Sequence, residues 1–241
     1  MNGIRPKKAI ALSAGLGTRM KPITDTMPKP LIKVFGKTLL DHGLDALSKN
    51  GVEETVVNVH YFAEQIIEHT STRLSPAIKI SDEREELMDS GGGVAKALPT
   101  LGNEPFYLLN ADSFWLEGSK PNLDLLGDSW RDDEMDILLL LSGTSNCVGY
   151  SGSGDFTMDS EGRLERRTER KLAPFAYSGA AIFHPRVFKD IPDGPFSLNL
   201  LFTRAIEQGR LFGVNMGGLW LHVGTPEAII EAEAAIAKSA A

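Results

Sequence analysis

A basic stretch rich in glycine and proline, residues 12–31, carries the residue types that bind phosphate. Gly15 and Gly17 allow the backbone to turn tightly and to point its N–H groups at a ligand. Arg19 and Lys29 add side-chain cations, and a guanidinium can bind one phosphate through two hydrogen bonds. Three prolines restrict the backbone, so the shape of the loop is largely set before a ligand arrives. The stretch therefore predicts a site for a phosphorylated ligand.

The local charge supports the same interpretation. Between residues 19 and 37 five basic residues stand against one acidic residue, a local charge of +4, whereas the whole chain has a formal charge of −7. Proteins that bind nucleic acid usually present a basic surface, and an acidic chain is unlike them. The sequence thus indicates a small phosphorylated ligand and no nucleic acid.

Two common glycine-rich motifs do not fit the stretch. A dinucleotide-binding fingerprint requires a third glycine where Met20 stands, and a P-loop requires a Gly-Lys-Ser/Thr sequence that is absent. The stretch instead resembles the signature of the sugar-1-phosphate nucleotidyltransferases, in which an apolar strand precedes x-A-G-x-G-T-R-x-x-P-x-T and then P-K-P-L. The matching residues are Ala14, Gly15, Gly17, Thr18, Arg19, Pro22, Thr24, Pro28, Lys29, Pro30 and Leu31.

The resemblance implies roles for residues around this loop. Arg19 would hold the β- and γ-phosphates of a nucleoside triphosphate, and Lys29 would lie near the α-phosphate and the attacking sugar phosphate. A run of three glycines, residues 91–93, is expected to precede an apolar helix and to contact the nucleobase. The nucleotide-binding residues that the resemblance implies are Leu12, Ala14, Gly15, Gly17, Thr18, Asn58 and Gly92.

Asp112 ends an apolar segment, residues 106–112, that is predicted to be a buried strand. On the residues alone, this carboxylate either meets a metal held by a triphosphate or only caps the following loop. The resemblance implies the first role, because the first metal-binding aspartate of the family stands in a similar L-x-N-x-D context. The implied cofactor is Mg²⁺, with Mn²⁺ as the alternative, and the implied catalytic residues are Arg19, Lys29 and Asp112.

The second metal motif of the family, W-x-D-x-G-T-P, is altered here because His222 stands where the family has aspartate. Imidazole is a poor ligand for magnesium, a hard cation that favours oxygen, so His222 is a doubtful metal ligand. Three alternatives stay open. The metal is held by Asp112, phosphates and water alone; or the imidazole contacts phosphate directly; or the protein has lost activity.

Sugar-binding residues are implied further along the chain. Residues 176–183 correspond to a strand that lines the sugar pocket in the family, and Ser178 and Gly179 match its small residues. Asp155 is a candidate acceptor for sugar hydroxyls, although a carboxylate at a turn more often only stabilises the turn. A Glu-Lys pair that holds the sugar phosphate in some relatives does not align clearly with Glu169 and Lys171.

Alternating strand and helix patterns are expected to position these residues. Residues 9–12, 55–59 and 77–80 are apolar or β-branched runs typical of strands, whereas residues 40–47 repeat leucine with helical spacing. Such alternation indicates a parallel sheet with helices on both faces, and ligands bind at the carboxyl ends of its strands. The predicted fold class is α/β, a Rossmann-like, doubly wound, mainly parallel mixed sheet of the nucleotide-diphospho-sugar transferase type. We expect one nucleotidyltransferase domain over residues 1–241.

Composition sets the remaining expectations. The 241 residues are 42% hydrophobic and 24% charged, which is ordinary for a globular chain, and Cys147 is the only cysteine, which excludes a disulfide framework within the chain. The sequence has no run of eighteen apolar residues and no apolar leader, so we expect a cytoplasmic protein with no membrane partner. The expected partners are a nucleoside triphosphate and a sugar 1-phosphate, with the chain a monomer or a small homo-oligomer.

The predicted reaction joins a nucleoside triphosphate to a sugar 1-phosphate and releases pyrophosphate. The short form, with D-S-G-G-G and W-x-H-V-G-T-P, most resembles the N-acetylmuramate-1-phosphate uridylyltransferases of cell-wall recycling, which implies UTP and N-acetylmuramate 1-phosphate. Mannose-1-phosphate guanylyltransferase and glucose-1-phosphate thymidylyltransferase are the alternatives. An alternative of another class is a catalytically weak regulatory protein that binds nucleotide-sugars. His222 favours that alternative, whereas the intact Arg19, Lys29 and Asp112 oppose it.

Overall fold

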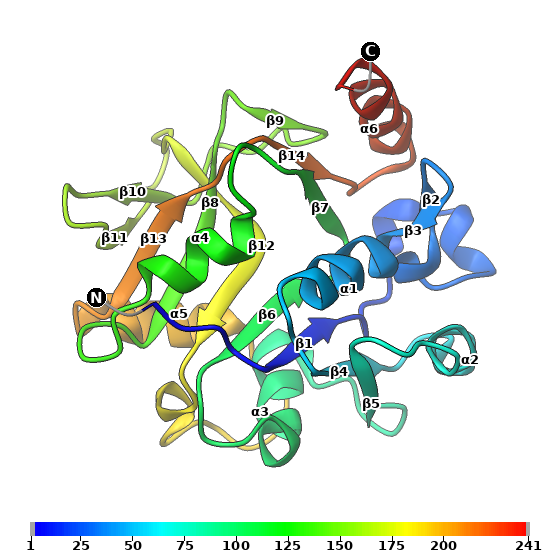
Figure 1. Ribbon diagram of the computed structural model, residues 1–241, viewed down its shortest axis with the longest axis horizontal. Helices are drawn as coiled ribbons and strands as arrows, with labels where there is room; N and C mark the ends of the chain where they lie inside the picture. Colours follow the sequence, from blue (N-terminus) through cyan, green and yellow to red (C-terminus); the bar gives the residue numbers. More distant parts are fainter. Residues whose placement is uncertain (1–2, 240–241) are drawn as a thin grey trace.

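The computed structural model describes residues 3–239 and, at position 113, the backbone alone. One sheet of nine strands runs through the described part of the chain (Figure 1). Its strands are β1 (Lys8–Leu12), β4 (Glu54–Val59), β5 (Ala77–Asp82), β6 (Phe106–Asn110), β8 (Ile137–Gly143), β10 (Phe156–Met158), β11 (Leu164–Arg166), β12 (Phe175–Phe183) and β13 (Leu211–Asn215). The short strands outside it are β2 (Lys33–Val34), β3 (Lys37–Thr38), β7 (Ser113–Leu116), β9 (Cys147–Val148) and β14 (Leu219–His222).

The sheet is mixed but mainly parallel, which confirms the predicted fold class. Its main path runs β5-β4-β1-β6-β12-β8-β13, and β12 is antiparallel to both of its neighbours on that path. The hairpin of β10 and β11 extends from one end of β12, where Phe156 pairs with Phe175. The parallel half therefore consists of β5, β4, β1 and β6, and the reversal at β12 separates it from β8 and β13.

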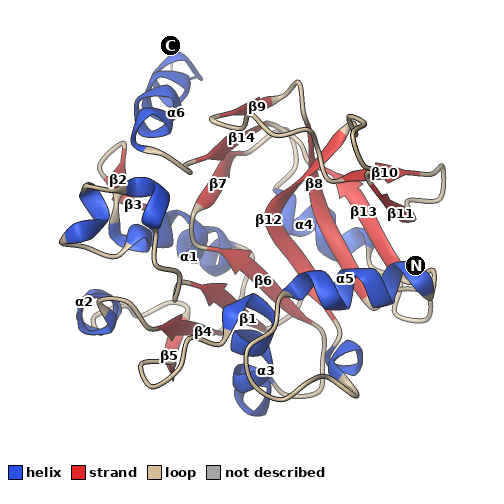
Figure 2. Ribbon diagram, turned by 180° about the vertical axis from the view of Figure 1, so that it is seen from behind, coloured by secondary structure: helices blue, strands red, loops and turns tan. Residues whose placement is uncertain are grey.

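Helices cover both faces of the sheet (Figures 1 and 2). The helices are α1 (Leu39–Lys49), α2 (Ala63–Thr70), α3 (Asp89–Leu101), α4 (Asn122–Ser129), α5 (Leu198–Glu207) and α6 (Pro226–Ser239). Alternate residues of a strand point to opposite faces, so Ala9 and Ala11 pack in the core beneath α1 and α4, whereas Ile10 packs in the core beneath α3 and α5. Both cores are buried, as near-continuous apolar strands require.

A third, smaller core anchors the basic loop to the carboxyl-terminal part of the chain. The loop contains three 3-10 turns, Thr18–Met20, Ile23–Asp25 and Lys29–Leu31. Met20, which is fully buried, packs in a cluster with Leu221 of β14 and other residues of β7 and α6. Strand β14 pairs with β7 on one side and with β9 on the other. The basic loop and the segment of His222 are thereby held together.

The three glycines of residues 91–93 lie within α3, so the prediction that they precede a helix is wrong. The N–H groups of Gly91 and Gly92 both donate to the carbonyl of Phe196, at 2.8 and 3.0 Å. A Cβ on Gly91 would lie 2.4 Å from the Phe196 ring, and one on Gly92 would lie 2.8 Å from the carbonyl oxygen of Gly194. These glycines therefore admit a neighbouring loop against the first turns of the helix.

Within residues 3–239, no helix combines the length and the apolar character that crossing a bilayer requires.

Candidate active site

A cavity of about 560 Å³ opens where the chain changes direction across the sheet. Strands β1 and β6 are parallel neighbours. From β1 the chain continues to β4 on one side of this pair, whereas from β6 it continues through β7 and α4 to β8, which lies beyond β12 on the other side. Loops that follow such strands diverge and leave a crevice at their carboxyl ends. The cavity is lined by Leu12, Ser13, Ala14, Gly15, Gly17, Thr18, Arg19, Met20, Lys29, Pro30, Asn58, Glu83, Leu87, Asp89, Ser90, Asn110, Ala111, Asp112 and Gly224.

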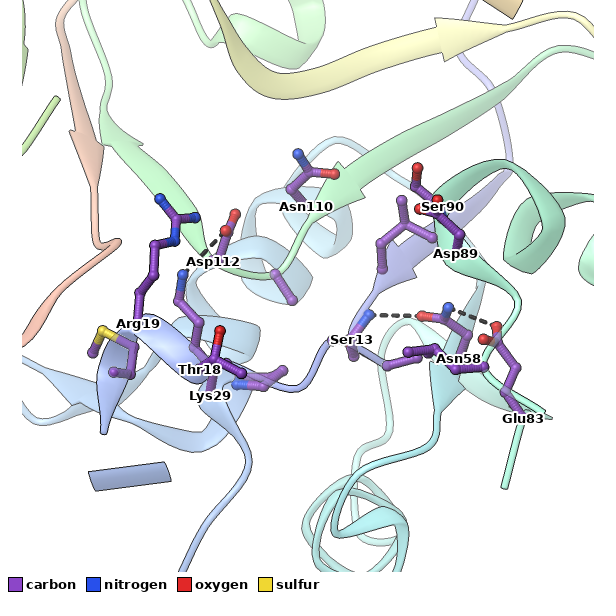
Figure 3. A pocket seen from close by; sticks show the side chains of 18 of the residues that line it. Ser13, Thr18, Arg19, Lys29, Asn58, Glu83, Asp89, Ser90, Asn110 and Asp112 are labelled. Carbon is purple, nitrogen blue, oxygen red and sulfur yellow. Dashed lines mark hydrogen bonds and ion pairs between the residues drawn. The ribbon is translucent and has the colours of Figure 1, made fainter. Parts of the chain in front are cut away.

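At one end of this cavity, a chain of buried polar groups fixes the loop that follows β1 (Figure 3). The N–H of Ser13 donates to Oδ1 of Asn58 at 2.6 Å, and Nδ2 of Asn58 donates to Oε1 of Glu83 at 2.8 Å. The other carboxylate oxygen of Glu83 accepts from the N–H of Met88 at 3.1 Å. Glu83 is completely buried, so these hydrogen bonds replace the water that its charge would otherwise need. Asn58 is thus held by its neighbours before any nucleotide binds.

At the other end, Gly17 makes the turn that presents Arg19. Its φ of 62° is left-handed, and a Cβ there would lie 3.0 Å from Cγ2 of Thr24 and 3.1 Å from Cβ of Lys29. The hydroxyl of Thr24 donates to the carbonyl of Gly17 at 2.9 Å and closes the turn. Arg19 lines the cavity and makes no ion pair with any described residue. The structure therefore leaves this exposed guanidinium free for an anionic ligand.

Lys29 and Asp112 meet across the cavity although 83 residues separate them. Nζ of Lys29 lies 3.1 Å from Oδ2 of Asp112, and the pair is drawn in Figure 3. Lys29 is 8% exposed, whereas the side chain of Asp112 is 33% exposed and reaches the cavity. An incoming phosphate would find a cation and a carboxylate side by side.

The described residues contain no group of three or more His, Cys, Asp or Glu side chains arranged to hold a metal ion. Asp112 is therefore a single carboxylate that a cation would share with ligand oxygens. Mg²⁺ is bound in this way at many triphosphate sites, where one or two carboxylates, phosphate oxygens and water complete an octahedron. The residues present fit a magnesium ion brought with the triphosphate better than one bound by protein alone.

His222 lies beside these groups but is not placed as a cation. Its Nδ1 is buried and has no hydrogen-bond partner among the described residues. Burial lowers the pKa of His222 below its usual value; the charge of Asp112 opposes this shift, and the charges of Lys29 and Arg19 reinforce it. The imidazole is consequently neutral at pH 7 in the ligand-free protein. A neutral imidazole does not replace the negative charge of the aspartate that the family has here. It also does not supply a positive charge for phosphate in the ligand-free protein.

A second cavity, of about 230 Å³, adjoins the first, and Ser90 and Asn110 line both. Asp155, which the sequence nominated for sugar binding, lines it, and its Oδ2 accepts the N–H of Tyr177 at 2.9 Å. The hydroxyl of Tyr177 is buried and has no hydrogen-bond partner within the described part of the chain, and burial together with the charge of Asp112 raises its pKa. The full lining is Ser90, Asn110, Asp155, Phe156, Arg166, Tyr177, Ser197, Leu198, Asn199 and Phe202.

Three residues that the sequence predicted to bind ligand do not line either cavity. Ser178 is completely buried and donates from Oγ to the carbonyl of Leu140 at 2.8 Å, so it does not line either cavity. Gly179 has a φ of 86° within an irregularity in the pairing of β12 with β8, a place where strand pairing is interrupted. Gly92 packs against the loop before α5, as described above, and is also absent from both linings. Leu12, Ala14, Gly15, Thr18 and Asn58, by contrast, all line the larger cavity.

Sequence reasoning missed several lining residues, chiefly Glu83, Ser90, Tyr177 and Arg166. Glu83 follows the predicted strand at residues 77–80, and this position at the carboxyl end of a strand could have indicated that it lines the site. Ser90 lies in the first turn of α3, just before the three glycines, and its hydroxyl accepts the N–H of Leu198 at 3.1 Å. Nothing in the local sequence indicates that Tyr177 and Arg166 meet, because separate strands bring them to the cavity.

Comparison with known proteins adds sequence relatives. The family model described as nucleotidyl transferase matches residues 8–239. N-acetylmuramate alpha-1-phosphate uridylyltransferase of Caulobacter vibrioides is 42% identical over 238 residues, which cover 97% of this chain and 98% of that protein. The enzyme of the same name from Neisseria meningitidis serogroup B is 31% identical, with 94% and 97% covered. The catalytic subunit beta of mannose-1-phosphate guanylyltransferase from Danio rerio is 29% identical, and the match covers 91% of this chain but 62% of that subunit.

Solved structures share the fold. A UDP-glucose pyrophosphorylase complexed with UDP-glucose has a TM-score of 0.76 and 18% identity, with 97% of this chain and 99% of that chain covered. The inositol-1-phosphate CTP transferase from T. maritima has a TM-score of 0.75 and 18% identity, with 96% and 98% covered. At this level of identity the likeness concerns the arrangement of the chain and no substrate.

Proposed function

We propose, from the premise that this chain belongs to the nucleotidyl transferase family and is a sugar-1-phosphate nucleotidyltransferase, that it joins UTP to N-acetylmuramate 1-phosphate. The products are UDP-N-acetylmuramate and pyrophosphate. The observation that carries this choice of substrates is the 42% identity, over nearly the whole of both chains, with the Caulobacter vibrioides enzyme of that name. The two adjoining cavities support it, because one nucleotide and one sugar phosphate must lie end to end for the reaction.

The proposed step is a displacement at the α-phosphorus of UTP. An oxygen of the sugar phosphate attacks that phosphorus, a new P–O bond forms, and the bond to the leaving pyrophosphate breaks and gives it the electron pair. The phosphate monoester is already an anion, so the protein needs no base to activate it. What the protein supplies is placement of the two reactants and stabilisation of charge.

Three charged residues of the larger cavity have a task in this scheme. Arg19, which makes no ion pair with a described residue, holds the β- and γ-phosphates until they leave. Lys29 stands between the attacking phosphate and the α-phosphate, where it offsets the repulsion between two anions. Asp112 would hold Mg²⁺, which, when bound, neutralises phosphate charge; Mn²⁺ is the alternative ion. Breaking the Lys29–Asp112 pair would free both groups for the substrates.

The polar chain at the other end of the cavity suits the nucleoside. Asn58 holds the loop after β1 through the N–H of Ser13, so Leu12 and Ala14 are fixed where a base and ribose would pack. We propose that Leu12, Ala14, Gly15, Gly17, Thr18 and Asn58 contact the nucleotide, and that Asp155 accepts hydroxyls of the sugar. The chain would act as one nucleotidyltransferase domain, which the family match over residues 8–239 supports.

A guanylyl transfer to mannose 1-phosphate is the second candidate, favoured by the 29% identity to the Danio rerio subunit. It is weaker because the match covers only 62% of that subunit. A purely regulatory role for the chain is weaker still, since Arg19, Lys29 and Asp112 all line the same cavity. We place the reaction in the cytoplasm and in the recycling of cell-wall sugars, with the chain a monomer or a small homo-oligomer.

A matrix of substrates tests the proposal. Purified protein is incubated with each of UTP, GTP and dTTP and with each of N-acetylmuramate 1-phosphate, mannose 1-phosphate and glucose 1-phosphate, in Mg²⁺. Pyrophosphate release gives the rate, and mass spectrometry identifies the nucleotide-sugar. We expect UTP with N-acetylmuramate 1-phosphate to give the highest kcat/KM. A higher value for another pair would reject the proposed substrates, and no turnover with any pair would favour the regulatory role.

A further inference from the structure

Two charged side chains line the smaller cavity, and they are not paired with each other. Asp155 stands just before β10 and Arg166 ends β11, and no ion pair joins them or links Arg166 to any described acid. A neutral sugar presents hydroxyl donors and acceptors, for which Asp155 is a sufficient partner. An Arg that faces the same cavity with no acid beside it calls for a different ligand group.

Arg166 is fixed by contacts that leave most of its donors unused. Its Cζ lies 5.5 Å from the centre of the Phe156 ring and 5.9 Å from the centre of the Phe202 ring. Its Nη2 donates to the backbone carbonyl of Asn199 at 3.1 Å and to Oδ1 of the same residue at 3.0 Å. Both acceptors are neutral, and Nε and Nη1 have no acceptor among the described residues. The guanidinium is thus oriented by aromatic stacking and one nitrogen, with its other donors open.

The rest of the cavity wall favours an anion at this place. Ser197, Leu198 and Asn199 form the start of α5 and line the cavity, and the first turn of that helix contains no acidic residue. The positive end of the helix dipole is therefore not neutralised by the chain itself. Partial burial lowers the pKa of Arg166 from its ordinary value, which the charge of Asp155 opposes, and the group remains a cation at neutral pH.

We propose that Arg166 binds a carboxylate on the sugar 1-phosphate and so selects a carboxylated sugar; this inference rests on the proposed function. N-acetylmuramate differs from N-acetylglucosamine by a lactyl ether whose carboxylate is ionised at neutral pH. Nε and Nη1, whose N–H groups point in different directions, can each donate a charge-assisted hydrogen bond to a carboxylate oxygen. Asp155 then serves the sugar hydroxyls and Arg166 the lactyl carboxylate, which explains why opposite charges share one cavity without pairing.

A structural role is the competing explanation, because Arg166 also ties the β10–β11 hairpin to α5. The chain offers a matched control in Arg163, which immediately precedes the same strand. Its Cζ lies 5.4 Å from the centre of the Phe212 ring and it pairs with Glu161, yet it lines neither cavity. Arg163→Met thus removes the same charge and the same kind of ring contact outside the proposed site.

The experiment compares N-acetylmuramate 1-phosphate with N-acetylglucosamine 1-phosphate, each with UTP, for the wild type, Arg166→Met, Arg166→Lys and Arg163→Met. We expect Arg166→Met to lower kcat/KM for the carboxylated sugar about 10- to 100-fold, mainly through KM, because a charge-assisted pair remote from the reacting phosphorus is lost. The kcat/KM for N-acetylglucosamine 1-phosphate should change less than about threefold, because this sugar has no carboxylate for Arg166 to contact. Arg166→Lys should lose less than Arg166→Met, since it keeps the charge but not the planar set of N–H donors.

Binding of the products gives a second readout that does not depend on turnover. In calorimetry, Arg166→Met should raise the Kd for UDP-N-acetylmuramate by about the factor by which it lowers kcat/KM. The Kd for UDP-N-acetylglucosamine should not change, and Arg163→Met should bind both products like the wild type. If the wild type prefers N-acetylmuramate 1-phosphate and Arg166→Met keeps that preference, or weakens both sugars equally, the inference fails and the proposed function stands. If the wild type shows no preference for the carboxylated sugar, the proposed substrate fails first.

Discussion

The two cavities are built in different ways. The larger one lies at the ends of the parallel strands β1, β4, β5 and β6 and at the loops that follow them, and the loop after β1 contributes small residues to its wall. The smaller one is lined by side chains from β12, the β10–β11 hairpin and the start of α5, beyond the antiparallel strand. Of the residues that the structure describes, Ser90 and Asn110 alone line both cavities.

This difference separates the recognition of phosphate, which all nucleoside triphosphates share, from the recognition of one particular sugar. A backbone cradle with Arg19 and the Lys29–Asp112 pair can receive any nucleoside triphosphate, since phosphate is common to all of them. A side-chain pocket with Arg166 and Asp155 can be retuned by single substitutions without disturbing that cradle. We therefore expect the larger cavity to determine whether the chemistry occurs and the smaller one to determine which sugar takes part.

The largest effect should come from Asp112→Asn. The variant keeps the shape of the side chain but loses the charge that would hold Mg²⁺, so we expect turnover to fall by at least about a thousandfold with every sugar. The comparison is with Asp25→Asn, which removes an exposed acid of the basic loop paired to Lys21 at 3.3 Å. Pyrophosphate release across a magnesium titration measures both. Near wild-type activity at low magnesium in Asp112→Asn would remove this residue from the cation site.

Lys29→Ala should lower turnover by more than about tenfold and leave the fold intact, because a charge contact that strengthens in the transition state is lost. Lys21→Ala, in the same loop but with its side chain 61% exposed, is the matched control and should behave like the wild type. Both are assayed with the carboxylated and the neutral sugar phosphate. Equal kcat/KM in wild type and a folded Lys29→Ala would contradict the role of this ammonium.

Asn58→Ala should act on the nucleotide alone. It leaves the N–H of Ser13 and the buried carboxylate of Glu83 each without one partner, and we expect KM for UTP to rise about tenfold. KM for the sugar phosphate should stay within about twofold of the wild-type value, because Asn58 does not line the smaller cavity. Asn50→Ala is the control, since its Nδ2 donates to Asp124 at 2.8 Å away from both cavities. A parallel rise in both KM values would show that the two cavities are not separable.

Gly93→Ala tests the wall behind that network through stability. A Cβ there would lie 2.8 Å from Oε1 of Glu83 and 2.9 Å from Nδ2 of Asn58, so we expect the free energy of unfolding to fall by about 1–3 kcal/mol. Gly143→Ala has no atom within 4 Å of the added Cβ and should change it by less than about 0.5 kcal/mol. Urea denaturation compares the two. Equal stabilities would mean that the network yields to an added methyl group.

The smallest effect is expected from His222→Asn on the pH profile of kcat/KM, which reports ionisations of the free enzyme. Burial lowers the pKa of this imidazole, so it is neutral from pH 7 upward and loses no proton between pH 7 and 9. The wild-type and variant profiles should therefore be parallel over that range. A wild-type rate that falls relative to the variant as pH rises would instead mean that a protonated His222 contributes.

The sequence predicted the larger cavity well because its chemistry is local. Gly17, Arg19 and Lys29 lie within one short motif, and an apolar run before them indicates the strand that positions it. The α/β fold class was predicted from the alternation of strand and helix patterns, which are also local features of the sequence. The contact of Lys29 with Asp112 across 83 residues was not predicted, since no local pattern brings these residues together; the resemblance implied a role for each of them separately.

Apart from Asp155, the lining of the smaller cavity was not predicted, because its residues come from separate elements. Small residues on the predicted strand at residues 176–183 suggested a pocket at Ser178, but the hydroxyl turns to the carbonyl of Leu140 and the neighbouring Tyr177 reaches the cavity instead. The glycines of residues 91–93 were expected to precede a helix, whereas they lie within α3 and pack tightly against the carbonyls of Gly194 and Phe196. In both cases tertiary contacts, which one sequence does not display, decide the outcome.

A crystal structure of the protein with UDP-N-acetylmuramate tests the division of the site most directly. We expect the uridine to lie against Asn58 and the loop after β1, the two phosphates beside Arg19 and Lys29, and the sugar in the smaller cavity with its carboxylate on Arg166. Ser90 and Asn110 should stand where the two halves of the ligand join. A sugar ring bound in the larger cavity, or a uracil beside Asp155, would contradict the account.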